Sequence, residues 1–194
     1  MLQERVCVRD LHIDTLVDLQ RYPLLDKGGD HWIQLVGDCR LQLADTGLFN
    51  LPGLLLPAAL ERIVAAINPL LETESFEHAR EHNIYFDDAI KQLPPDHPAL
   101  ARFHTSNRTL CADQISDSLI LSLYEWRPFV EFLAACMDKS VLWPMQDPLA
   151  RVNVMSYREG QALNWHFDRA EFTTTVLLQA PESGGVFEYA RDLR

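Results

Sequence analysis

Apolar side chains recur at intervals of three and four residues in the first part of the chain, as on one face of an α-helix. Residues 31–46 form one such segment, and Gly47 should end it. Residues 48–51 suggest a short strand, after which Pro57 opens a second helix that Pro69 should kink or end. The apolar positions of the two helices are Trp32, Leu35, Val36, Cys39 and Leu43, then Leu60, Ile63, Val64 and Ile67.

Two further helices are expected, one capped by Ser116 or Asp117 and one starting at Pro128. From residue 150 the pattern changes to the alternation of β-strands, and turn residues separate the apolar runs. The strands expected there are 152–157, 164–168, 172–179 and 186–190. This pattern predicts a single α+β domain, mostly helical over 1–149, with the first strands of a β-sandwich or jelly roll over 150–194.

Composition excludes several classes of partner. The net charge is −11 and no run of Lys or Arg occurs, so we expect no nucleic-acid groove, because phosphates are bound by clustered cations. No apolar run approaches the roughly 20 residues of a membrane span. The four cysteines are widely spaced, with no Cys-X-X-Cys, which favours reduced thiols in a cytoplasmic protein.

A His-X-Asp pair, His166 and Asp168, lies in the expected strand 164–168. Side chains two apart on a strand share one face, so the imidazole and the carboxylate should converge on one point. These are two of the three ligands of the facial triad that binds non-heme Fe(II). A second pair, His12-Ile13-Asp14, lies in a helix-like segment where residues two apart diverge, and we interpret it as surface.

Further motifs surround the second pair: Tyr157-X-X-Gly160 before it, and Gly184-Gly185-X-Phe187 after it. With these motifs the chain resembles the Fe(II)/2-oxoglutarate-dependent oxygenases, most closely the branch that halogenates and hydroxylates free amino acids. The stretches that carry the resemblance cover most of the chain and are 21–24, 46–53, 104–108, 165–168 and 185–188.

The resemblance implies a double-stranded β-helix (a jelly roll) with a packed N-terminal helical layer, and a need for Fe(II), 2-oxoglutarate and O2. His166 and Asp168 would be the iron ligands, and Tyr157 would donate a hydrogen bond to 2-oxoglutarate. The residues implied on the substrate side are Trp165, Arg169 and Arg108. Halogenating members carry Gly or Ala in place of Asp168, so we expect hydroxylation of a small molecule, and the resemblance implies a free amino acid as the substrate.

Two functional residues of that superfamily have no match in this chain. A second histidine ligand should follow the first, and then an arginine for the distal carboxylate of 2-oxoglutarate. His166 is the last of the seven histidines, and Arg191 and Arg194 come too early to match. We therefore expect a jelly roll that is incomplete at the C-terminus, an unidentified third ligand, weak Fe(II) binding and no turnover by this polypeptide alone.

Two alternatives remain open at this point. His78, Glu81 and His82 have the H-x-x-E-H spacing of inverted zinc peptidases, which would suit a helix with both histidines on one face. The missing second histidine instead favours a non-catalytic jelly-roll remnant that binds a small ligand or a partner.

Overall fold

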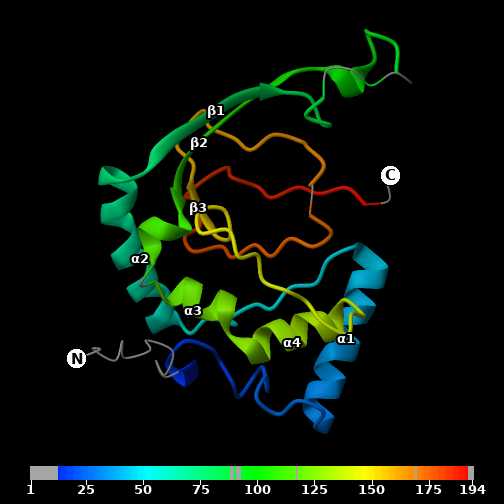
Figure 1. Cartoon of the computed structure of the whole chain (residues 1–194), viewed down its shortest axis with the longest axis vertical. Coiled ribbons are helices and arrows are strands. Elements are labelled where there is room, and N and C mark those ends of the chain that lie inside the picture. Colours follow the sequence, from blue (N-terminus) through cyan, green and yellow to red (C-terminus); the bar gives the residue numbers. More distant parts are fainter. Residues whose placement is uncertain (1–12, 88–89, 91–92, 117, 169, 192–194) are drawn as a thin grey trace, which may run out of the picture.

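The protein combines helices with a small three-stranded antiparallel sheet, described by a computed structural model for residues 13–87, 90, 93–116, 118–168 and 170–191. The helices gather on one side, the curved sheet lies opposite, and the C-terminal chain runs between them (Figure 1). The helices are α1 (Asp30–Thr46), α2 (Pro57–Thr73), α3 (Leu119–Glu125) and α4 (Arg127–Cys136), with 3₁₀ turns η2 (Ile13–Thr15), η3 (Pro98–Leu100) and η4 (Ala112–Ile115). The strands are β1 (Phe76–His82), β2 (Phe103–Cys111) and β3 (Asn153–Ser156).

Helix α1 confirms the predicted helix and its end. Gly47 adopts a left-handed conformation, with φ of 84°, and its backbone N–H donates to the carbonyl of Leu43. A side chain is strained in that conformation, which explains why glycine ends this helix. The buried residues are predicted apolar positions: Trp32, Val36 and Cys39.

Helix α2 begins at Pro57 as predicted, and of the two effects expected of Pro69, a kink or an end, the end does not occur. The helix continues to Thr73, whose hydroxyl donates to the carbonyl of Pro69. Its apolar face stays buried along Ala59, Ile63 and Ile67, and this packing offsets the hydrogen bond that proline cannot make. The strand expected over 48–51 is absent, and this loop packs on the core instead.

The caps of the two short helices differ in part from those predicted. The hydroxyl of Ser118 caps α3 by accepting from the backbone N–H of Ile120. Ser116 instead ends the preceding 3₁₀ turn, and Asp117 lies outside the described residues. Pro128 stands in the first turn of α4, as predicted.

The sheet has the order β1-β2-β3, and both of its neighbouring pairs are antiparallel. Two of its strands come from the part of the chain expected to be mostly helical. Strand β3 confirms part of the predicted strand 152–157. Residues 164–168, 172–179 and 186–190 form no regular strands in their described parts, because they have no extended ladder with a neighbour. A single isolated antiparallel bridge, between Ser106 and Ala162, pairs the chain just before residue 164 with β2.

The hydrophobic core lies between the four helices and the sheet. Phe132 of α4 is fully buried and meets Phe49 edge to face, with 6.5 Å between ring centroids. Cys39 and Cys136 are free, buried thiols joined by a hydrogen bond, which raises the pKa of Cys136 and lowers that of Cys39. Among the helices of the described chain, none is both long and apolar enough to cross a membrane.

We expect Phe132→Ala to lower the free energy of unfolding by about 3–5 kcal/mol, because it leaves a cavity in the core that the neighbours cannot fill. Leu41→Ala on the exposed face of α1 serves as the control and should change stability by less than about 0.5 kcal/mol. Urea unfolding followed by circular dichroism measures both values. Equal effects of the two substitutions would contradict this location of the core.

Candidate functional site

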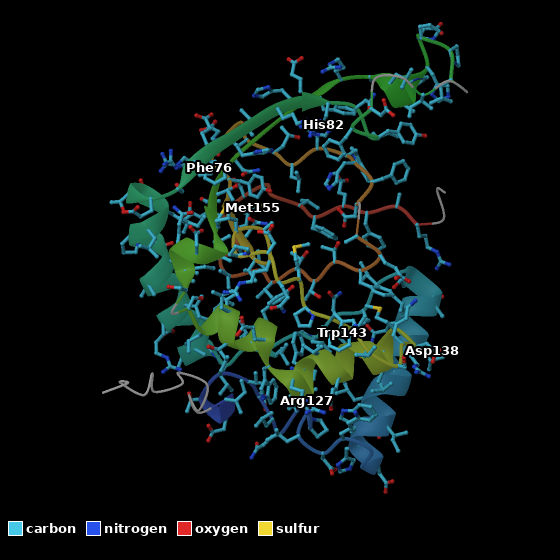
Figure 2. All side chains as sticks on the ribbon, viewed as in Figure 1. Phe76, His82, Arg127, Asp138, Trp143 and Met155 are labelled. Atoms are coloured by element: carbon cyan, nitrogen blue, oxygen red, sulfur yellow. The ribbon has the colours of Figure 1, made fainter. Side chains whose placement is uncertain are left out.

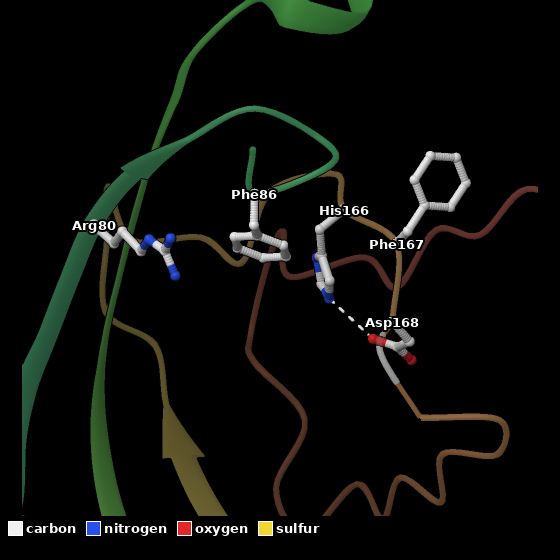
Figure 3. A pocket seen from close by; sticks show the side chains of 5 residues that line it. All are labelled: Arg80, Phe86, His166, Phe167 and Asp168. Carbon is white, nitrogen blue, oxygen red and sulfur yellow. Dashed lines mark hydrogen bonds and ion pairs between the residues drawn. The ribbon is translucent and has the colours of Figure 1, made fainter. Parts of the chain in front are cut away.

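A cavity of about 230 Å³ lies beneath the end of β1, between the hairpin of β1 and β2 and the irregular chain that follows β3. Figure 3 shows its lining residues: Arg80, Phe86, His166, Phe167 and Asp168. Both members of the predicted His-X-Asp pair are therefore in its wall.

The side chains of His166 and Asp168 converge as the sequence predicts, although their backbone is irregular rather than a strand. Nε2 of the imidazole lies 3.1 Å from Oδ1 of the carboxylate, and the two groups point toward each other (Figure 3). The imidazole and the carboxylate each have a further hydrogen-bond partner. Nδ1 of His166 lies 2.7 Å from the carbonyl oxygen of Asn164, and the hydroxyl of Thr173 donates to Oδ2 of Asp168 at 2.8 Å.

These contacts determine what Nε2 of His166 can bind. A carbonyl oxygen only accepts, so Nδ1 carries the proton of its hydrogen bond to Asn164. The carboxylate of Asp168 also only accepts, so its contact with Nε2 needs a second proton or a metal cation between the two atoms.

The pair fits a metal ion in its donor chemistry. Histidines that bind metals commonly donate their other ring N–H to a backbone carbonyl, as His166 does. An imidazole nitrogen and a carboxylate oxygen are both donors that a divalent transition-metal cation accepts. The side chain of His166 is 22% exposed and that of Asp168 is 54% exposed, so the pair is open to solvent on one side.

Hydrogen bonds attach the segment that carries the pair to the hairpin of β1 and β2. The Thr105 hydroxyl accepts from the backbone N–H of Asn164 at 3.2 Å, and the Asn164 side-chain amide donates to the carbonyl of His104 at 2.8 Å. The backbone N–H of Phe167 donates to the carbonyl of Ile84 at 2.9 Å. Together these bonds hold both ends of the segment 164–167 against the hairpin.

His82, at the end of β1 (Figure 2), adds a buried side chain to this network of hydrogen bonds. Its side chain is buried, with Nδ1 2.8 Å from the carbonyl of Asn83 and Nε2 2.7 Å from the hydroxyl of Thr105. Because Nδ1 must donate to the carbonyl, Nε2 accepts from Thr105. The ring also meets that of His166 edge to face, at 6.5 Å between centroids. His82 therefore supports the site and has no ring nitrogen left for a metal.

The zinc hypothesis for His78, Glu81 and His82 is wrong in its geometry. The segment is strand β1, paired along its length with β2, and not a helix. Alternation places Glu81 on the opposite face from the two histidines. His78 is exposed while His82 is buried and hydrogen-bonded, so no two-histidine site forms.

The ring of Phe86 forms an aromatic wall of the cavity. Hydrogen bonds of the Asn83 side chain stabilise the turn that places this ring. The Asn83 amide donates to the carbonyl of Asp87 at 2.6 Å, and its side-chain oxygen accepts from the backbone N–H of Tyr85 at 3.0 Å. Within this turn Phe86 has a φ of 56°, which costs a non-glycine residue about 1–2 kcal/mol. Its ring stacks on His82 at 4.3 Å and lies 5.6 Å from the ring of His166.

The remaining predicted site residues do not line this cavity in the described structure. Tyr157 is partly exposed, its hydroxyl contacts the sulfur of Met155, and burial raises its pKa. Trp165 is half exposed. Arg108 donates twice to Ser75, at 2.8 Å each, and so ties β2 to the end of α2. Arg169 lies outside the described residues.

Sequence reasoning missed Arg80 and Phe86, which line the cavity, and Thr105, which supports it. The signal for Arg80 was its position midway between His78 and His82, since alternation on a strand would place all three on one face. No group of three or more His, Cys, Asp or Glu side chains suited to a metal occurs among the described residues. No family model matches the chain, and neither a curated protein nor a solved structure is significantly similar to it.

We expect Thr105→Val to release the segment 164–167, because valine keeps the shape of threonine but loses both hydrogen bonds of its hydroxyl. Hydrogen exchange of the Asn164 and Phe167 amides, followed by NMR, should accelerate by about tenfold or more, given about 1–3 kcal/mol for each buried group left unpaired. Thr105→Ser should restore protection.

The matched control is Thr109→Val, on the same strand, where the hydroxyl bonds Asn107 and not the segment. Protection of Asn164 that survives Thr105→Val, or is lost equally in Thr109→Val, would contradict this role.

Proposed function

We propose that the protein is a non-heme Fe(II)- and 2-oxoglutarate-dependent dioxygenase that hydroxylates a small molecule, with a free amino acid as the substrate class. The sheet would then be part of a double-stranded β-helix. The observation that carries the proposal is the convergence of His166 Nε2 and Asp168 Oδ1 at 3.1 Å in the wall of a cavity.

His166 and Asp168 would hold the iron, which, when bound, supplies the oxygen chemistry that protein side chains lack. In the balanced reaction, 2-oxoglutarate loses CO2 and becomes succinate with one oxygen atom of O2, and the other atom enters a C–H bond of the substrate. The carboxylate at Asp168 favours hydroxylation over halogenation, because halogenating members leave this position free for chloride.

The chain itself would contribute orientation and shielding. The Asn164 carbonyl fixes the tautomer of His166, and Thr173 orients Asp168, so each ligand would be held by a hydrogen bond on the side away from the metal. The rings of Phe86 and Phe167 line the cavity and would exclude water from the bound substrate.

A second candidate function is binding of a small ligand without catalysis. It is favoured by the absence, among the described residues, of a third metal-binding side chain beside His166 and Asp168. Two protein ligands bind an ion less tightly than three, so metal binding and turnover have to be tested separately.

We expect His166→Ala and Asp168→Ala each to weaken metal binding by more than about tenfold, since removing a direct ligand costs at least as much as removing its supporting partner. Mn(II) titration followed by electron paramagnetic resonance measures this in the full chain without oxidation. His31→Ala, exposed on α1, is the control and should bind as the parent does. Equal affinity of His166→Ala and the parent would refute the metal site.

Catalysis is tested by incubating the Fe(II)-loaded chain with 2-oxoglutarate, O2 and the common amino acids. Succinate that forms with one amino acid, and is lost in Asp168→Ala, would support the oxygenase and would overturn the expectation that this polypeptide alone does not turn over. Binding of metal and 2-oxoglutarate without succinate would instead favour the non-catalytic candidate.

A further inference from the structure

Arg80 presents a cation to the cavity from the side opposite Asp168. It stands on β1, on the same face as His82, and its guanidinium lies over the ring of Phe86 at 5.1 Å from the centroid. Figure 3 shows Arg80, Phe86, His166 and Asp168 in a row, with the two charged groups at its ends.

The guanidinium of Arg80 has no carboxylate partner within the described residues. Other arginines are paired: Arg102 with Glu81 on the same hairpin, and Arg158 with Glu72. Phe86 keeps the guanidinium in place through a cation–π contact, without using its hydrogen-bond donors. Arg80 is thus a positioned cation whose donors remain available for a ligand.

We propose that Arg80 binds the carboxylate of a small molecule that occupies this cavity. A guanidinium offers two parallel N–H donors to a carboxylate, which a lysine ammonium cannot do. The cavity volume of about 230 Å³ equals that of roughly eight water molecules, so the ligand is small. Phe86, between the ends of the row, suits an apolar middle portion of that molecule.

The inference rests on the proposed function only for the metal end of the cavity. The carboxylate could belong to 2-oxoglutarate or to the amino acid itself, and both would present the same group to Arg80. Analogues that lack one carboxylate separate the two sources, because 2-oxobutyrate keeps the keto-acid end of 2-oxoglutarate but lacks its distal carboxylate, and L-leucinamide lacks the carboxylate of L-leucine.

The test is calorimetric titration of the Mn(II)-loaded full chain with these four probes, for the parent, Arg80→Met and Arg80→Lys. Methionine keeps much of the apolar stem and removes the charge. We expect Arg80→Met to weaken binding of either 2-oxoglutarate or L-leucine by about tenfold or more, while the analogue that lacks the corresponding carboxylate is unaffected. Arg80→Lys should fall between the two. Arg102→Met, on the same hairpin, is the control and should match the parent.

Loss with 2-oxoglutarate would identify the keto acid as the source, and loss with L-leucine the amino acid. Parental affinity of Arg80→Met for both 2-oxoglutarate and L-leucine, or equal losses for them and for the analogues that lack one carboxylate, would overturn the proposal. Repeating the titrations without metal separates the two hypotheses: an Arg80-dependent preference for acids that persists in a chain unable to bind Mn(II) would retain the carboxylate site and remove the iron site.

Discussion

The hydroxyl of Thr105 joins two parts of the protein on which the candidate site depends. It donates to buried His82 on the adjacent strand and accepts from Asn164, which stands 59 residues later in the chain. Asn164 in turn holds the imidazole of His166 by its carbonyl. Because the segment 164–168 has no ladder of its own, this chain of hydrogen bonds orients the pair in place of the strand that the sequence predicted.

The helices and the sheet have separate tasks in this arrangement. The helices bury most of the apolar side chains and give the domain its core around Phe132. Strand β1 contributes little to that core, since most of its residues are exposed, whereas β2 buries Leu110 in it. The hairpin of β1 and β2 also carries His82, Thr105 and Arg80, which meet the chain after β3. The cavity is therefore built by long-range polar contacts and not by the packing that stabilises the fold.

This division explains which features were predictable. Helices α1 and α2 follow from local apolar spacing, and the His166–Asp168 pair follows from a separation of two residues. Strand β1 was missed because its sequence has no alternating apolar residues, and its pairing partner lies on a distant part of the chain. The prediction of strands after residue 160 was wrong for the opposite reason. Their local pattern suits a strand, but no neighbour completes the hydrogen bonds.

Phe86 adopts a strained backbone conformation with positive φ, and in that conformation its aromatic ring lies beside the imidazole of His166. Glycine would relax that backbone, but it would remove one wall of the cavity. Directed evolution for thermal tolerance alone would thus be drawn toward glycine at this position and would erode ligand recognition. A screen that couples heat resistance to binding would retain the ring, so the position distinguishes the two selective pressures.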